Sequence, residues 1–256
     1  MHSFYKYNST GNDFVVIDNR SKLFLHEPNY IRRICNRNFG VGSDGLILLE
    51  RSQSADYFIN YFNSDGFPST FCGNGSLCCA HFANSIDIIE DEGSFETREG
   101  LFQCSVENNH VSISMQDVLD FELNEDHVII NTGSPHYVVF VDDLNIIDVN
   151  VIGKKIRNKK EFYQDGINVT FATLQNKKLS IRTYERGVES ETLSCGTGAV
   201  AAVMTAALRD YISTKSIDVV TVGGVLNVAF QLHNLRFSNI VLSTDLSNVF
   251  KGQLNF

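Results

Sequence analysis

The sequence lacks an excess of basic residues. Its 256 residues include 21 lysines and arginines against 30 aspartates and glutamates, which gives a formal net charge of -9. Nucleic acids and anionic membrane surfaces bind to basic faces, so neither is expected as a partner. The chain also lacks an apolar run long enough to cross a membrane, and its start, MHSFYKYNST, lacks the features of a signal peptide. We therefore expect a globular cytoplasmic protein.

Cysteine pairs at short spacing are also missing. None of the six cysteines belongs to a CxxC motif, and two of them, Cys78 and Cys79, are adjacent. Closed zinc sites usually show paired ligands at short spacing, so we expect no metal. Without an export signal, the cysteines are expected to be thiols rather than a disulfide framework.

The sequence does contain an internal repeat. The stretch YFNSDGFPSTFCGNG, residues 61–75, aligns without a gap with YERGVESETLSCGTG, residues 184–198. The segment TGNDFVVID likewise resembles TGSPHYVVFVD, with Phe14 matching Tyr137 at the same offset. Two matches at one offset indicate two similar halves. We place them at residues 1–118 and 119–245, joined around 114–127, where no proline-rich or serine-rich linker occurs.

Short β-branched and aromatic segments bounded by glycine, asparagine or aspartate predict strands through most of the chain. The predicted strands include residues 13–18, 45–50, 57–62, 110–115, 137–141, 167–174, 179–184 and 239–244. Helices are fewer: residues 27–37 and 148–158, and one after each of Cys72 and Cys195. The helix GAVAAVMTAAL is apolar on nearly all sides, which is typical of a buried helix. We therefore predict two α+β domains, each a curled, mainly antiparallel sheet wrapped around a central helix.

The position of Cys72 and Cys195 at helix starts suggests a chemical role. Unpaired N–H groups and the positive end of the helix dipole both stabilise a thiolate there. The glycines that follow let an anion such as a carboxylate approach the backbone. Small buried cysteines are common, but two such turns related by a duplication favour a function.

Two cysteines opposed across a cleft could invert one carbon centre. One would remove a proton as a thiolate while the other supplied a proton as a thiol. Two facing helix ends would hold the substrate carboxylate and stabilise its developing charge. Such a mechanism requires no pyridoxal lysine, so we expect no cofactor.

The chain resembles the diaminopimelate epimerase family over essentially its whole length. The resemblance is carried by GNDFVVID, FNSDG, CGNG, GSPHYVVFVD, GINVTF, YERGVESETLSCGTG and VGGVLNV, in family order. It implies interconversion of LL- and meso-2,6-diaminopimelate in lysine and peptidoglycan precursor biosynthesis. It also implies a pseudo-symmetric two-domain fold, a homodimer, and a C-terminal tail, residues 246–256, that returns to the first domain.

The resemblance also implies roles for individual residues. Cys72 and Cys195 match the catalytic cysteines, and Arg186 would bind the distal carboxylate with its two-pronged donor geometry. His136 and Glu185 would tune the thiols, Glu185 also contacting the substrate. The remaining matched positions are substrate contacts: Gly73, Asn74, Gly196 and Thr197 for the reacting carboxylate, and Asn12, Asn63 and Asn168 as amide ligands.

The sequence departs from the family pattern at a few positions. Ser134 stands where many members have asparagine, Gly45 where some have glutamine, and Leu77 where arginine is common. The segment RGVESET is one residue longer than its commonest form. These departures affect individual contacts and one loop rather than the expected reaction.

Two other interpretations remain open. The proline racemase and hydroxyproline epimerase group shares the paired-cysteine chemistry, although CGNG rather than CGHG in the first half argues against it. A thiol redox module or a catalytically silent binding protein is the alternative from a different class.

Overall fold

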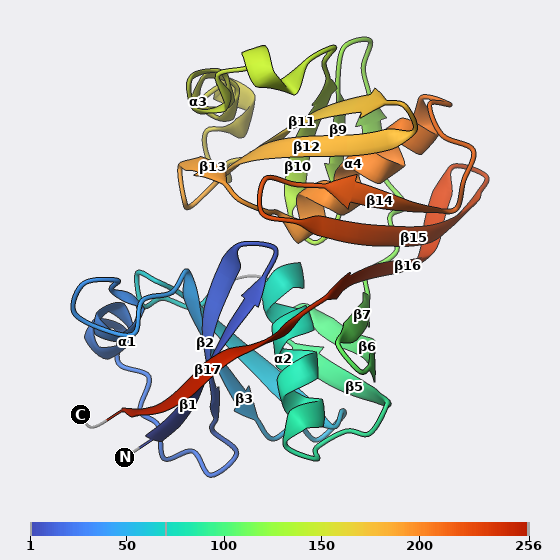
Figure 1. Cartoon of the computed structure of the whole chain (residues 1–256). Coiled ribbons are helices and arrows are strands. Elements are labelled where there is room, and N and C mark those ends of the chain that lie inside the picture. The colour runs from blue at the N-terminus through green and yellow to red at the C-terminus, as the bar shows by residue number, and fades with distance from the viewer. Residues whose placement is uncertain (1, 70, 255–256) are drawn as a thin grey trace. The chain divides into compact units, whose positions relative to one another are not determined.

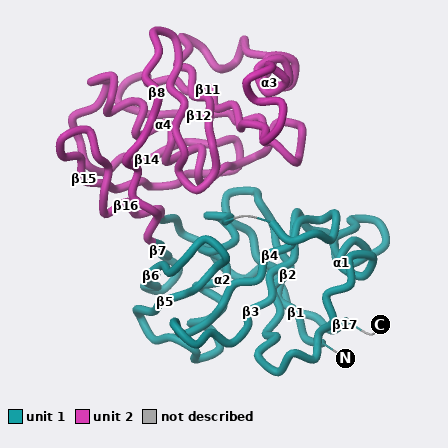
Figure 2. Tube along the Cα trace, turned by 180° about the vertical axis from the view of Figure 1, so that it is seen from behind, with its two compact units in different colours: residues 1–113, 243–256 teal, residues 114–242 magenta. Residues whose placement is uncertain are grey.

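The computed structural model describes residues 2–69 and 71–254 of the chain. The chain forms two compact units (Figure 2): unit 1 comprises residues 1–113 and 243–256, and unit 2 comprises residues 114–242. Each unit is described separately below. Among the described residues, no helix is both long and apolar enough to cross a membrane.

Unit 1 is a curled sheet around one central helix, α2 (Figure 1). Its elements are β1 (His2–Ser9), β2 (Asn12–Asp18), α1 (Pro28–Cys35), β3 (Gly45–Glu50), β4 (Tyr57–Asn63), α2 (Gly73–Ser85), β5 (Glu92–Thr97), β6 (Gly100–Glu107), β7 (His110–Ser114) and β17 (Ser247–Leu254). The pairs β2–β3 and β4–β5 are parallel. The pairs β17–β1, β1–β2, β3–β4, β5–β6 and β6–β7 are antiparallel.

Unit 2 repeats this arrangement around helix α4. Its elements are β8 (Phe121–Leu123), β9 (Val128–Asn131), β10 (Pro135–Phe140), the 3-10 helix η1 (Leu144–Ile146), α3 (Val149–Arg157), the 3-10 helix η2 (Lys160–Phe162), β11 (Asn168–Gln175), β12 (Lys178–Glu185), β13 (Ser190–Thr192), α4 (Gly196–Leu208), β14 (Ser216–Val220), β15 (Val225–His233) and β16 (Arg236–Asp245). The parallel pairs β10–β11 and β12–β14 correspond to β2–β3 and β4–β5 of unit 1. The prediction of two α+β halves is confirmed, because the same strand order recurs in each.

Small side chains explain why the two central helices can be enclosed by sheet. In α4 every residue except the last, Leu208, is buried, and alanine, glycine, valine and threonine supply nearly all of them. Helix α2 buries ten of its 13 residues. The contrast is α1, in which only Ile31, Ile34 and Cys35 are buried, as expected for a helix lying on the outside of a sheet.

The C-terminal strand belongs to unit 1. Strand β17 pairs antiparallel with β1, so that Leu254 lies opposite His2. The side chains of Leu254 and Phe4 join the core cluster that contains Val15 and Leu46. Residues 255 and 256 of the tail lie outside the described residues.

Candidate active site

Cys72 is the N-cap residue of α2. Its backbone is extended, with φ -124° and ψ 108°, and its Sγ accepts a hydrogen bond from Gly75 N at 3.4 Å. The helix begins here because the Cys72 carbonyl accepts from Ser76 N at 2.8 Å, the first hydrogen bond of the α-helical ladder. A sulfur that accepts an N–H at a helix N-terminus is stabilised in its thiolate form.

The glycines of CGNG let α2 begin close to the sheet. A Cβ atom added at Gly75 would lie 3.2 Å from Ile47 Cδ1, so a side chain there would press on Ile47, and it would also contact the Cys72 sulfur at 3.5 Å. The first-turn N–H groups of Gly73 and Asn74 point along the helix axis toward its N-terminal end, which favours an anion. The predicted carboxylate contacts therefore lie beside Cys72.

Asn12 and Asn74 meet next to this helix start. Asn74 Nδ2 lies 3.4 Å from Asn12 Oδ1, and Asn74 Oδ1 accepts from Ser9 Oγ at 3.3 Å. Asn12 Nδ2 donates to Asp44 Oδ2 at 2.8 Å. The structure thus brings the predicted amide ligand Asn12 next to Asn74 of the predicted carboxylate pocket. It adds Asp44, which was not singled out from the sequence.

Asn63 ends strand β4, where its backbone closes a turn. Its N–H donates to Phe67 O at 3.0 Å and its carbonyl accepts from Gly66 N at 2.9 Å. It pairs with Gly45 of β3 in the antiparallel ladder. The predicted ligand therefore lies at the end of the strand that also carries Tyr61.

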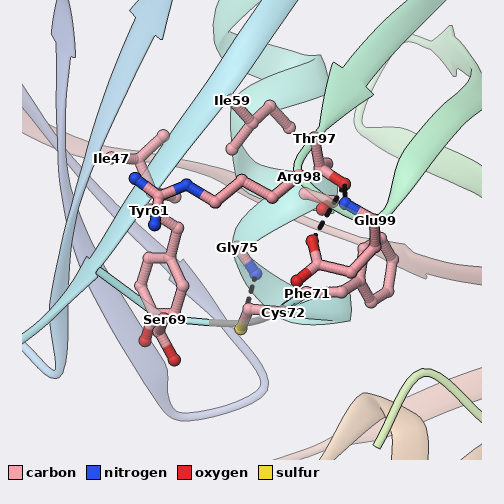
Figure 3. Close-up of a pocket in the computed structure, with 11 residues that line it drawn as sticks. Ile47, Ile59, Tyr61, Ser69, Phe71, Cys72, Gly75, Thr97, Arg98 and Glu99 are labelled. Carbon is pink, nitrogen blue, oxygen red and sulfur yellow. Dashed lines mark hydrogen bonds between the residues drawn. The ribbon is translucent and has the colours of Figure 1, made fainter.

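A pocket in unit 1 opens beside Cys72 (Figure 3). Tyr61, Arg98 and Glu99 surround it, with Cys72 and Phe71 at one edge. Arg98 Nη2 donates to Asn60 Oδ1 at 3.2 Å. Cys72 therefore borders a cavity that is lined by apolar side chains as well as by Arg98 and Glu99.

Cys195 is the N-cap residue of α4, with φ -133° and ψ 110°. The hydrogen bond from Ala199 N to its carbonyl, at 2.9 Å, begins the helix. Its sulfur lies 3.5 Å from the hydroxyl oxygen of Thr197. A Cβ at Gly198 would lie 3.1 Å from the hydroxyl oxygens of Thr170 and Thr183, so a side chain there would require these hydroxyls to shift by a few tenths of an ångström.

His136 is fully buried and connects Cys195 to the sheet. Its Nε2 lies 2.8 Å from Thr197 Oγ1, and its Nδ1 lies 3.0 Å from Thr170 Oγ1. Asn168 Nδ2 lies 3.3 Å from the same Nε2. His136 and Thr197 were expected from the sequence but Thr170 was not; its only signal is its place on β11, two residues after Asn168, which pairs with His136 of β10.

The partners of Asn168 determine where the His136 proton lies. Arg186 N–H donates to Asn168 Oδ1 at 3.0 Å, so the other end of that amide, Nδ2, faces Nε2 of His136 and can only donate. Nε2 is therefore an acceptor and Nδ1 carries the proton. The Thr197 hydroxyl then donates to Nε2, and its oxygen accepts from the Cys195 thiol.

Burial keeps this imidazole neutral. It lowers the pKa of His136 to about 3, with a smaller contribution from the positive charge of Arg186. Near pH 7 the imidazole accepts a hydrogen bond from Thr197 without bearing a charge itself.

Glu185 and Arg186 follow one another at the end of β12. Glu185 Oε1 accepts from Thr192 Oγ1 at 2.5 Å, and Arg186 Nη1 donates to the Asp165 carbonyl at 2.7 Å. Arg186 is partly buried, and this burial lowers the pKa of its guanidinium. The backbone N–H of Arg186 donates to Asn168 Oδ1. The predicted ligands Arg186 and Asn168 therefore lie together in unit 2.

The departures from the family pattern have structural reasons. A Cβ at Gly45 would lie 2.5 Å from the Tyr61 ring, so that ring already fills the space beside Gly45. Ser134 Oγ accepts from Asn168 Nδ2 at 2.8 Å, and Leu77 is buried in the core of unit 1. The longer loop folds as a hairpin between β12 and β13, with Glu189 accepting from Gly187 N at 3.1 Å.

The other four cysteines are buried free thiols. Burial raises the pKa of Cys78 and Cys79 well above the usual range, and raises that of Cys104 to about 11. Thiols in this state are poor nucleophiles. Within residues 2–69 and 71–254, no three histidine, cysteine, aspartate or glutamate side chains form a group that could hold a metal ion.

Comparison with known sequences identifies the family. The family model described as Diaminopimelate epimerase matches residues 4–119 and 128–243, which is most of each half. The chain belongs to the diaminopimelate epimerase family. The family consists of amino-acid epimerases, which are isomerases.

Curated relatives with the family name match nearly end to end. The diaminopimelate epimerase of Flavobacterium psychrophilum is 43% identical over 250 residues, covering 96% of this chain and 98% of the relative. That of Chlorobaculum tepidum is 39% identical over 258 residues, covering 96% and 99%. The paired-cysteine pattern noted above therefore occurs in a chain with full-length epimerase relatives.

Solved structures with low sequence identity show the fold alone. A phenazine biosynthesis protein of the PhzF family from Bacillus anthracis has a TM-score of 0.76 at 15% identity, covering 100% of this chain and 99% of that one. A probable proline racemase from Agrobacterium radiobacter has a TM-score of 0.74 at 16% identity, covering 100% and 93%. The diaminopimelate epimerase family thus shares its fold with proteins of other names.

Proposed function

We propose that this protein interconverts LL- and meso-2,6-diaminopimelate without a cofactor, using Cys72 and Cys195 as the acid–base pair. One observation carries the proposal. Each unit has a cysteine at the N-cap of its buried central helix, followed by Gly-X-Gly. Core packing alone does not explain why a cysteine occupies the same position in both halves. A two-base reaction does, because it needs one acid–base group on each side of the carbon.

The reaction conserves protons at each step. A thiolate takes the α-proton and becomes a thiol, while the electron pair of the broken C–H bond is delocalised into the substrate carboxylate. The opposite thiol then donates its proton to the other face of the carbon and becomes a thiolate. The protonation states of the two sulfurs are therefore exchanged after each turnover, and the mechanism requires both sulfurs to reach the same carbon.

The helix starts supply the electrostatics of this step. Backbone N–H groups at Gly73, Asn74, Gly196 and Thr197 would bind the carboxylate and stabilise the charge that it gains as the proton leaves. Because these groups are fixed by the helices, they need no reorganisation during the reaction.

The hydrogen bonds of the two sulfurs suit opposite roles. The Cys72 sulfur accepts an N–H from Gly75, which favours a thiolate, whereas the Cys195 thiol has an acceptor in Thr197. Thr197 in turn donates to the neutral His136. His136 therefore tunes Cys195 through a hydroxyl, so the free enzyme would hold Cys72 as the base and Cys195 as the acid.

Arg186 and its neighbours would select the substrate by length. Its guanidinium can bind a second carboxylate with paired hydrogen bonds, and Glu185 can accept from the distal ammonium group. Asn63 adds a neutral amide, and Asn168, whose Nδ2 faces Ser134 and His136, holds the backbone of Arg186 in place. Short amino acids lack this distal group and would bind poorly.

The family resemblance supports a setting for the reaction. We propose that the enzyme acts in the cytoplasm as a homodimer and supplies meso-diaminopimelate for lysine and peptidoglycan precursor synthesis. Size-exclusion chromatography with light scattering would test the dimer.

Incubation of the protein with diaminopimelate in heavy water tests the function itself. We expect deuterium at the α-carbon and conversion of the LL isomer to the meso isomer. Faster racemisation of proline would assign the protein to the proline racemase group instead. Reversible thiol inactivation with no exchange into either amino acid would favour the redox interpretation.

A further inference from the structure

A network of four charged side chains lies beside Asn12 in unit 1. Asp13 forms ion pairs with Lys6 at 2.6 Å and with Arg37 at 2.8 Å. Arg37 also reaches Asp44 at 2.8 Å, and Asp44 accepts from Asn12 Nδ2 at 2.8 Å. The two carboxylates thus share one guanidinium, and one of them holds an amide that the proposed function places at the substrate.

The loop between α1 and β3 is shaped to build this network. A Cβ at Gly40 would lie 2.0 Å from the Arg33 carbonyl oxygen, and Gly42 has φ +79°. Only glycine suits both positions, and the resulting tight path brings Arg37 and Asp44 over Asp13. The buried Lys6 ammonium secures the loop by donating to the Gly42 carbonyl.

Asp44 also joins the loop to the start of β2. Its Oδ2 accepts from Asp13 N at 3.1 Å, and its own N–H donates to the Asp13 carbonyl at 2.9 Å. These contacts fix the carboxylate relative to the backbone that carries Asn12. The network remains charged at neutral pH: burial opposes ionisation of Asp13, but hydrogen bonds from Arg37 and Lys6 outweigh it and lower its pKa to about 2.

The carboxylate of Asp44 determines which way the Asn12 amide faces. A carboxylate only accepts hydrogen bonds, so Nδ2 of Asn12 must face Asp44. The carbonyl Oδ1 is then directed toward Asn74 in the first turn of α2, 3.4 Å from its Nδ2. Asn12 therefore presents its carbonyl oxygen at the first turn of α2, the helix that Cys72 caps. The second lone pair of that oxygen is an acceptor, which an ammonium group of a substrate requires.

We infer that Asp44, held by Arg37, is a positioning residue that orients Asn12 so that its carbonyl oxygen faces the ammonium group of the bound amino acid. The inference rests on the proposed function, because it takes Asn12 to contact the substrate. It assigns a role to the segment NRNFGVGSDG, in which sequence analysis had singled out only Gly45.

A double-mutant cycle between Asp44→Asn and Asn12→Ala tests this role. The Asp44 side chain is 43% exposed, so an isosteric amide should leave the fold intact, which a thermal melt checks. The amide at position 44 can turn its NH2 group toward Asn12 and so release the fixed orientation. We expect Asp44→Asn to lower kcat/KM for diaminopimelate by about tenfold, mainly by raising KM.

In the Asn12→Ala background the same change should cost less than about twofold, because the group through which Asp44 acts is gone. Asp18→Asn is the matched control: Asp18 lies at the other end of β2 and pairs with Arg20, and its loss should leave kcat/KM unchanged. An equal cost of Asp44→Asn in both backgrounds would refute the inference. Wild-type kinetics for Asp44→Asn or for Asn12→Ala would also refute it.

The wild-type measurement separates this inference from the proposed function. Absence of α-proton exchange in the wild type would refute the function and the inference with it. Normal exchange in the wild type together with an uncoupled cycle would refute only the role of Asp44. Arg37→Met, which removes the guanidinium that restrains Asp44, provides a second variant and should also raise KM.

Discussion

His136 provides a quantitative prediction about stability and pH. Its imidazole is fully buried between Thr197 and Thr170, and burial lowers its pKa from 6.5 to about 3. In the unfolded chain the same group takes up a proton near pH 6.5, whereas the folded state remains neutral. The free energy of unfolding is therefore highest, as far as this group is concerned, above pH 6.5. It decreases progressively as the pH falls from 6.5 toward 3, because only the unfolded state gains a proton there.

The magnitude follows from the linkage between protonation and folding. Between pH 7.5 and pH 5 the unfolded histidine becomes protonated while the folded one does not. This difference lowers the free energy of unfolding by about 2 kcal/mol, at about 1.4 kcal/mol per pH unit below the unfolded pKa. Glutamine does not titrate. In His136→Gln the decrease in the free energy of unfolding between pH 7.5 and pH 5 should therefore be about 2 kcal/mol smaller than in the wild type.

Native-state hydrogen exchange of the α4 amides, corrected for the intrinsic pH dependence, measures this difference in unit 2 alone. His233→Gln is the control, because the His233 side chain is exposed to water in the folded state as in the unfolded one. If the wild type and His136→Gln lost the same free energy between pH 7.5 and pH 5, the buried neutral imidazole would be refuted.

Three further predictions concern catalysis. Cys72→Ala and Cys195→Ala should each abolish epimerisation while circular dichroism shows an intact fold. Near wild-type turnover by either variant would contradict the two-base mechanism. Elimination from halogenated analogues could persist in either variant, because it needs only one base. Mild oxidation should join Cys72 to Cys195 in a disulfide and inactivate the enzyme reversibly, while the buried Cys78 and Cys79 stay reduced. Mass spectrometry that found a disulfide between other cysteines, or none, would count against two sulfurs acting on one carbon. Arg186→Met should weaken diaminopimelate binding at least about tenfold, since a charged hydrogen bond contributes about 1.5 to 3 kcal/mol; unchanged kcat and KM would show that the distal carboxylate binds elsewhere.

The repeat, the fold class and the central helices could be predicted because their signals are local. Strand segments such as residues 45–50 and 179–184 have β-branched and apolar composition, and both fall within observed strands. The small apolar residues after Cys195 leave α4 no polar face, so it must be enclosed by sheet. The matched Cys-Gly-X-Gly turns likewise place both cysteines at helix starts without reference to distant residues.

The partners of the site residues depend on the tertiary structure. Asp44 is 32 residues from Asn12, and Thr197 is 61 residues from His136, so no local pattern relates them. Hydrogen-bond donors and acceptors acquire a direction only when the sheet closes around the helix and excludes water, since an exposed amide or imidazole can exchange its partners with solvent. The positions of the two cysteines could therefore be read from the chain, whereas the neutral state of His136 and the orientation of Asn12 were decided by folding.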